Sequence, residues 1–137
     1  MKRPRVLIAD DEPGMRQLLK GFLSEDYDVV GTATDGQTLL TAAMQLHPDI
    51  IISDIEMPGL DGIEAARQLK ALIPRAKVLF LTSHADLEHI AAAFAAGAAG
   101  YLIKGESPDL LSNLSRTMEG LCSQSGPTVD LFAASRR

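Results

Sequence analysis

Residues 50–54 of the chain are Ile-Ile-Ile-Ser-Asp, an unbroken apolar run that ends in a hydroxyl and a carboxylate. A continuous apolar run of this length is typical of a strand buried on both faces of a parallel sheet. Runs of the same kind cover residues 6–9 and 78–81, and a shorter one covers residues 101–103. A run of mixed polarity at residues 27–30 fits a strand at the edge of the sheet. The sequence therefore predicts five short strands, most of them buried.

Helical patterns lie between and after these runs. Apolar side chains recur at steps of three and four, so that each segment has one apolar stripe; the stripes are Met15, Leu18, Leu19, Phe22 and Leu23, then Leu39, Ala42, Ala43 and Leu46, then Ile63, Ala66, Leu69, Leu72 and Ile73, then Leu87, Ile90, Ala91, Phe94 and Ala95, and finally Leu110, Leu111, Leu114 and Met118. Pro13 suits a first helical turn, Asp35 suits a helix cap, and Ser107-Pro108 is expected to open the last helix. Regular alternation of strands and helices predicts an α/β fold of five βα units, a doubly wound parallel sheet with helices on both faces.

Composition limits the classes of protein to which the chain can belong. Its 137 residues suit one domain, with 18 acidic against 13 basic residues and a net charge of −5. An acidic balance argues against a nucleic-acid-binding surface on this chain. The single Cys122 excludes an intramolecular disulfide, and no Cys/His spacing typical of a zinc site is present. The basic start of the chain is followed by too short an apolar run for a signal peptide, and no run approaches a membrane span, so we expect a cytoplasmic protein without membrane contact.

Residues at the ends of the predicted strands are the functional candidates, because ligands of such sheets bind beyond the carboxyl ends of the strands. These residues are Asp10, Asp11 and Glu12 after the first strand, Ser53 and Asp54 after the third, Thr82, Ser83 and His84 after the fourth, and Lys104 after the fifth. Clustered carboxylates repel one another, and a hard cation such as Mg²⁺ removes that conflict. A carboxylate beside the cation is a possible nucleophile toward phosphorus, with an ammonium and a hydroxyl around the transferred oxygens.

Each of these residues alone has an ordinary explanation. Asp10-Asp11 is a common helix cap with a solvated charge, Thr82 suits a cap of the following helix, and a lone lysine is usually a surface residue. Their joint position at one edge of one predicted sheet favours the functional interpretation. His47 and His89 are expected to be solvated helix residues.

Three segments together resemble the receiver domain of two-component response regulators. They are residues 6–12, with Asp10-Asp11-Glu12; residues 54–62, with Asp54-Ile55-Glu56-Met57-Pro58-Gly59; and residues 96–104, ending in Ile103-Lys104. The likeness covers about residues 4–121 and implies a flavodoxin-like or CheY-like fold with strand order 2-1-3-4-5. Residues 98–104 are most similar to regulators with a LuxR-type helix-turn-helix output.

The resemblance implies a role for each matched position. Asp54 would be the phosphoacceptor, and Mg²⁺ or Mn²⁺ would be held by Asp11 directly, by Asp10 through water, by Asp54 and by the backbone carbonyl of Glu56. Lys104 would pair with the phosphoryl group, Thr82 would turn toward it, and Tyr101 would rotate inward. The side chains of Glu56 and His84 would lie near the attacking water. Many members have proline after the lysine, whereas this chain has Gly105, which leaves open the isomer of the Lys104–Gly105 peptide.

A sensor histidine kinase would be the phosphodonor, and the surface of the fourth helix, fifth strand and fifth helix would change on phosphorylation. We expect the receiver domain at residues 1–122 and a linker or short docking tail at residues 123–137, where Val129, Leu131 and Phe132 are apolar. Either a fused output domain outside this chain controls transcription, with DNA contacts made only by that domain, or the protein is a stand-alone regulator that acts by protein–protein contact. A homodimer on phosphorylation is implied by family likeness alone.

Three rival functions have less support from the residues. An aspartate-nucleophile phosphatase usually has an Asp-x-Asp pattern after the first strand, where this chain has adjacent aspartates. In a flavodoxin-like cofactor site, the acidic residues 10–12 would repel the anionic phosphate of the cofactor. A purely structural pseudo-receiver would not need Asp54, Thr82 and Lys104. We therefore expect no enzyme activity beyond metal-dependent self-phosphorylation and autodephosphorylation.

Overall fold

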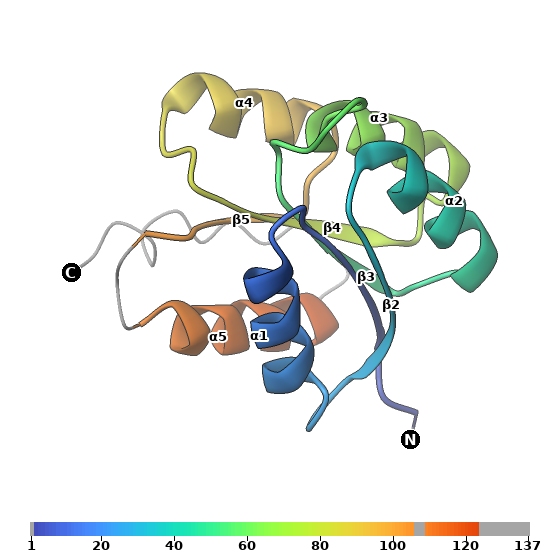
Figure 1. Cartoon of the computed structure of the whole chain (residues 1–137), viewed down its shortest axis with the longest axis vertical. Coiled ribbons are helices and arrows are strands. Elements are labelled where there is room, and N and C mark those ends of the chain that lie inside the picture. Colours follow the sequence, from blue (N-terminus) through green and yellow to red (C-terminus); the bar gives the residue numbers. More distant parts are fainter. Residues whose placement is uncertain (1, 106–108, 124–137) are drawn as a thin grey trace.

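Five parallel strands form the centre of the computed structural model, which describes residues 2–105 and 109–123. The strands lie in the order β2-β1-β3-β4-β5, as predicted. Strands and helices alternate along the chain: β1 (Arg5–Ala9), α1 (Pro13–Leu23), β2 (Asp28–Ala33), α2 (Gly36–Leu46), β3 (Ile50–Ser53), α3 (Gly62–Leu72), β4 (Lys77–Thr82), α4 (Leu87–Ala95), β5 (Gly100–Ile103) and α5 (Leu110–Ser123). In Figure 1, α1 and α5 cover one face of the sheet, and α2, α3 and α4 cover the other.

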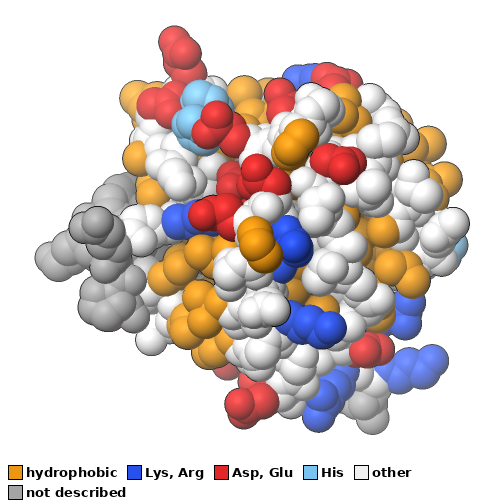
Figure 2. Space-filling model, viewed as in Figure 1, with side chains coloured by type: hydrophobic (Ala, Val, Ile, Leu, Met, Phe, Trp, Pro, Cys, Tyr) orange, Lys and Arg blue, Asp and Glu red, His pale blue; other side chains and the backbone are white. Residues whose placement is uncertain are grey.

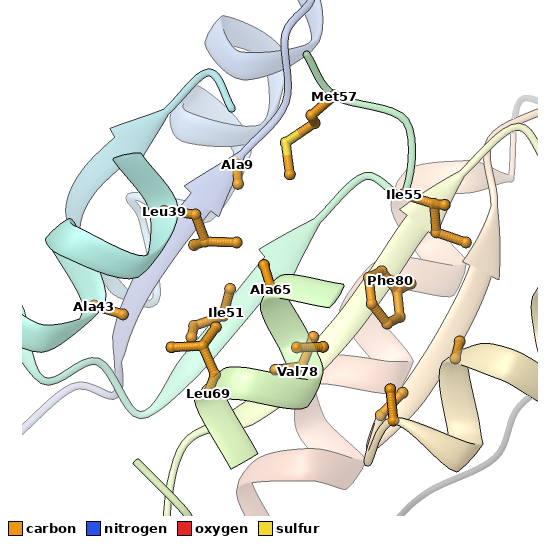
Figure 3. Packing of buried hydrophobic residues seen from close by; sticks show 14 of the residues in the cluster. Ala9, Leu39, Ala43, Ile51, Ile55, Met57, Ala65, Leu69, Val78 and Phe80 are labelled. Carbon is orange, nitrogen blue, oxygen red and sulfur yellow. The ribbon is translucent and has the colours of Figure 1, made fainter. Parts of the chain in front are cut away.

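The strands other than β2 are largely buried, because their side chains point alternately to the two faces of the sheet and helices cover both faces (Figure 1). A hydrophobic core lies on each face of the sheet. Val6 and Ile8 of β1 pack in the first core with residues of α1 and α5, whereas Leu7 and Ala9 pack in the second core with residues of α2, α3 and α4. Figure 3 shows this second core, where side chains from the sheet meet Leu39, Ala65 and Leu69 of the helices. The continuous apolar runs of the sequence are explained by this arrangement, since every residue of β3, and every residue of β1 after Arg5, is buried.

Three helices begin at an aspartate that caps the first turn. The Asp35, Asp61 and Asp86 carboxylates accept hydrogen bonds from the backbone N–H groups of Thr38, Glu64 and His89 at 2.8, 2.8 and 3.1 Å. Pro13 lies in the first turn of α1, as expected. These caps fix where the chain leaves each loop above the sheet, and two of those loops contribute to the site described below.

Three leucines of the predicted stripes do not pack into the core. Leu18, Leu72 and Leu87 are 45%, 53% and 81% exposed, so the apolar stripes extend beyond the buried face at these positions. Leu72 is the last residue of α3, and Leu87 is the first residue of α4. The expected helix start at Ser107-Pro108 and the apolar tail residues Val129, Leu131 and Phe132 lie outside the described residues. No helix in the described part of the chain has the length and apolar composition that a membrane span requires.

Candidate functional site

Asp10 and Asp54 follow the carboxyl ends of the adjacent strands β1 and β3. The backbone N–H of Asp10 donates to the Ala33 carbonyl at 3.0 Å, and that of Asp54 donates to the Ala9 carbonyl at 2.9 Å. These bonds extend the sheet pattern by one residue and hold both aspartates at its rim. Their side chains are nevertheless buried, with 1% of Asp10 and 7% of Asp54 exposed.

Lys104 joins the two aspartates from the far side of the sheet. Its backbone N–H donates to the Thr82 carbonyl at 2.7 Å, which places it directly after β5. Its Nζ donates to Asp10 Oδ2 and to Asp54 Oδ2, each at 2.8 Å, and to Glu12 Oε1 at 3.2 Å. Strands distant in sequence thus bring an ammonium group into contact with three carboxylates.

Glu12, a strand-end candidate to which the sequence analysis gave no separate role, belongs to this carboxylate group. Among the described residues, one oxygen each from Asp10, Glu12 and Asp54 lies within 4.8 Å of the other two. The Glu12 N–H donates to Asp10 Oδ1 at 2.9 Å, and this tight turn brings the Glu12 side chain back toward Lys104. Asp11 lies between them in the chain, but its side chain is exposed and is not one of the three.

Burial dominates the electrostatics of the group. Burial raises the pKa of Asp10 above its ordinary value, and the nearby charge of Asp54 adds to the rise, while Lys104 and the Glu12 N–H oppose it. For Lys104, burial alone would lower the pKa, but the hydrogen bonds to Asp10 and Asp54 outweigh it and raise the pKa. Three carboxylates and one ammonium leave a formal charge of −2 (−3 + 1) when all four groups are ionised. Such a set of oxygens suits a hard divalent cation.

Thr82 and Tyr101 lie beside this group, at the end of β4 and on β5. Both are fully buried. Thr82 Oγ1 accepts a long hydrogen bond of 3.4 Å from the His84 N–H, and the Tyr101 hydroxyl donates to the His84 carbonyl at 2.7 Å. The ring of Tyr101 packs near Phe80 and Phe94, with centroid distances of 6.3 and 6.4 Å. Tyr101 therefore already occupies an inward position in this structure.

Comparison with known families identifies the arrangement. Residues 6–116 match the family model described as the response regulator receiver domain. The chain belongs to this family.

Known response regulators resemble this chain both in sequence and in fold. The transcriptional regulatory protein LnrK of Bacillus subtilis is 38% identical over 109 residues, which cover 78% of this chain and 50% of that protein. A LuxR-family response regulator from Aurantimonas sp. superposes with a TM-score of 0.85 at 27% identity, over 98% of this chain and 94% of that chain. The receiver domain of NarL from Mycobacterium tuberculosis gives a TM-score of 0.81 at 27% identity, over 90% and 100% of the two chains. The chain spans about half the length of the curated relatives it matches.

The departure of this receiver after Lys104 has a structural reason. Gly105 has a φ of +58°, in the left-handed region that favours glycine. Proline, whose φ is fixed near −65°, cannot adopt this conformation. Among the described residues no peptide bond is cis, so the open question of the Lys104–Gly105 isomer is answered as trans.

A second cluster of polar side chains lies close to the first in this receiver. His84 Nε2 lies 2.6 Å from Glu56 Oε1, and the rings of His84 and His89 stack with centroids 4.0 Å apart. His89 Nδ1 lies 2.7 Å from Asp86 Oδ2. Figure 2 shows a group of histidine side chains, in pale blue, beside acidic side chains on one face of the molecule. His89 lies in α4 with 36% of its side chain exposed, in line with the expectation of a solvated helix residue. Its contacts with Asp86 and His84 were not predicted from the sequence.

Proposed function

We propose that Asp54 is the phosphoacceptor of this receiver and that Lys104 holds the phosphoryl group. The observation that carries the proposal is the position of Lys104 Nζ, 2.8 Å from Oδ2 of both Asp54 and Asp10. An oxygen of Asp54 attacks the phosphorus of a phosphohistidine, the P–N bond breaks, and the freed imidazole keeps the electron pair and takes a proton. Hydrolysis by water later returns the carboxylate and releases inorganic phosphate.

The residues at the site provide charge and hydrogen bonds for this transfer. The Ile55 N–H donates to Asp54 Oδ1 at 2.6 Å and orients the carboxylate. The ammonium of Lys104 stays protonated, since its pKa is raised, and balances charge on the phosphoryl oxygens. Thr82 has a hydroxyl whose proton suits a phosphoryl oxygen, a bond available only in the phosphorylated state.

The donor set also fits Mg²⁺ or Mn²⁺. The raised pKa of Asp10 supports this fit, because buried carboxylates that repel one another are stabilised by a nearby cation. Asp10, Asp11, Asp54 and the backbone carbonyl of Glu56 would hold the ion, with Glu12 as a further carboxylate at the same place. When bound, the ion would neutralise negative charge between Asp54 and the phosphodonor.

We propose that switching follows from a hydrogen bond between Thr82 and the phosphoryl group, which forms only in the phosphorylated state. A ligand shifts a conformational equilibrium only by its different affinity for the two states. A phosphoryl group bonded to Thr82 would draw that side chain toward Asp54 and favour the inward position of Tyr101. The surface formed by α4, β5 and α5 would then differ between the two states and be recognised by a partner.

A sensor histidine kinase is the proposed phosphodonor, and transcription control is the proposed output. Relatives such as LnrK are named transcriptional regulators and are about twice the matched length. We infer that residues 1–122 act as the receiver, that residues 123–137 lead to an output domain outside this chain, and that DNA contacts belong to that domain. Phosphorylation-dependent homodimerisation and a cytoplasmic location complete the proposal. The length of the encoding reading frame tests the output domain directly.

Phosphorylation is tested by incubating the chain with Mg²⁺ and acetyl phosphate and measuring the intact mass. We expect one labile phosphoryl group, and we expect beryllofluoride to bind. Asp54→Asn should lose both, whereas Asp28→Asn, an exposed aspartate at the start of β2, should keep both. A labelled Asp54→Asn protein, or a parent protein that neither gains mass nor binds beryllofluoride, would overturn the proposal.

A further inference from the structure

His84, Asp86 and His89 form a group of metal-type ligands outside the carboxylate cluster. They lie on the connection from β4 to α4 and in the first turn of α4, where Asp86 is the capping residue. One ligand atom from each lies within 4.8 Å of the others. All three side chains remain accessible, since 25% of His84, 50% of Asp86 and 36% of His89 are exposed.

The contact between His84 and Glu56 prepares one of these ligands. A ring N–H of histidine that donates to a carboxylate leaves the other ring nitrogen with its lone pair, which is how metal-binding histidines are usually oriented. Glu56 Oε1 lies 2.6 Å from His84 Nε2, and His84 Nδ1 faces Asp86 Oδ1 at 3.9 Å. Nδ1, the His84 nitrogen that would keep its lone pair, is therefore the one near the carboxylate that would share the ion.

His89 approaches the same carboxylate from the helix. Its Nδ1 lies 2.8 Å from Asp86 Oδ1 and 2.7 Å from Oδ2. A metal ion would replace the proton in this contact. The rings of His84 and His89 stack at 4.0 Å with 18° between their planes, so their lone pairs need a small ring rotation to converge. Histidine and aspartate χ2 torsions have broad minima that permit such a rotation.

We propose that His84, Asp86 and His89 bind a borderline transition metal, with Zn²⁺ as the expected ion. Two imidazoles and one carboxylate match the ligands of open zinc sites, in which water takes the fourth position. Mg²⁺ prefers oxygen ligands and would stay at the carboxylate cluster. The two sites thus differ in ligand chemistry, although the contact between His84 and Glu56 connects the zinc site to the loop after β3.

Metal binding at this site would act on the loop that contains the Tyr101 contact. His84 accepts the Tyr101 hydroxyl through its carbonyl at 2.7 Å, and its N–H donates to Thr82. An ion that ties the His84 ring to α4 would hold this loop in the conformation that keeps Tyr101 inside. Zinc binding at this site does not require a phosphoryl group on Asp54.

Zinc titration calorimetry on the 137-residue chain with excess Mg²⁺ tests the proposal. We expect one zinc ion per chain, and affinity at least about tenfold weaker in His84→Gln and in His89→Gln, with a loss of about tenfold in Glu56→Gln. His47→Asn is the matched control, because His47 is an exposed histidine at the end of α2 with a φ of +50°, which asparagine tolerates. Cys122→Ser, which removes the one thiol, should also bind zinc like the parent.

Two further measurements make the outcome decisive. Co²⁺ in place of Zn²⁺ should give visible absorption from an imidazole-bound ion in the parent, which is lost in His84→Gln and His89→Gln. Asp54→Asn should bind zinc like the parent, so failure of the phosphorylation proposal leaves this result unaffected. Absence of zinc binding, equal affinity in the parent and the two histidine variants, or loss of zinc in Asp54→Asn alone would overturn the proposed site.

Discussion

Lys104→Met removes the positive charge from the carboxylate cluster and leaves its shape nearly unchanged. In the parent, Lys104 Nζ contacts Asp10 Oδ2 and Asp54 Oδ2 at 2.8 Å, and all three side chains are at least nine-tenths buried. Removing one partner of a buried ion pair costs about 3–5 kcal/mol, because the remaining charge has no compensation. We expect a decrease of about that size in the free energy of unfolding at neutral pH, measured by urea denaturation.

The penalty should depend on pH in a defined direction. Without Lys104, the pKa of Asp10 rises further above its ordinary value of 3.8, because burial and Asp54 then act unopposed by the ammonium. When folding raises the pKa of a group, the folded protein becomes less stable as the pH increases from the pKa of that group in the unfolded state through its pKa in the folded state. The variant should therefore approach the parent in stability as the pH falls toward about 4. Added Mg²⁺ should stabilise the variant more than the parent, if the cluster binds the ion.

Lys20→Met is the matched control for this experiment. Lys20 is exposed near the end of α1, and its replacement should change the free energy of unfolding by no more than about 0.5 kcal/mol. The reasoning is refuted if Lys104→Met is as stable as Lys20→Met, or if its deficit is the same at neutral and acidic pH.

Other perturbations test the packing around the site. Gly62→Ala should lower the free energy of unfolding by about 1–3 kcal/mol in urea denaturation, because the new methyl would overlap the Asp54 carbonyl oxygen. Gly21→Ala is the control: open space surrounds Gly21 in α1, and the substitution should raise the free energy of unfolding by about 0.5–1 kcal/mol. Equal effects of the two substitutions would contradict the close approach of Gly62 to the Asp54 carbonyl. Tyr101→Phe should cost about 1 kcal/mol through loss of the bond to the His84 carbonyl, and a variant as stable as the parent would argue against that bond. Burial raises the pKa of Tyr27 and of Tyr101 from 10.0 to about 12. The free energy of unfolding should therefore be unaffected below about pH 10 and fall toward pH 12, by up to about 2.7 kcal/mol for Tyr101. Tyrosinate absorbance that rises near pH 10 in the folded protein would contradict this prediction.

The fold could be predicted from the sequence because the strands other than β2 are largely buried on both faces. Such strands give continuous apolar runs, and residues 50–53 and 78–81 lie inside β3 and β4. The stripes of the helices were less informative, since a stripe shows periodicity but not where the helix leaves the core. Leu87 lies at the first position of α4 and is 81% exposed, although it continues the stripe of Ile90 and Phe94.

The candidate site could be predicted only to the level of the strand ends. Topology brings the ends of β1, β3, β4 and β5 to one edge, so Asp10, Asp54, Thr82 and Lys104 meet there whatever the details of the loops. The contribution of Glu12 depends on a single hydrogen bond, from its N–H to Asp10 Oδ1, that no periodic pattern encodes. The contact of His84 with Glu56 joins residues 28 positions apart in the sequence, and a local sequence pattern cannot predict such a contact.

His84 connects the two groups of polar side chains through separate parts of one residue. Its backbone contacts Thr82 and Tyr101, while its ring contacts Glu56 in the loop after β3. A change in charge at the phosphorylation site would reach it through Thr82 and through the loop that carries Glu56. A metal ion on the ring would reach Thr82 and Tyr101 by the same backbone. Because both routes end on His84, the two ligands would be coupled, and by linkage each would alter the affinity for the other by the same factor.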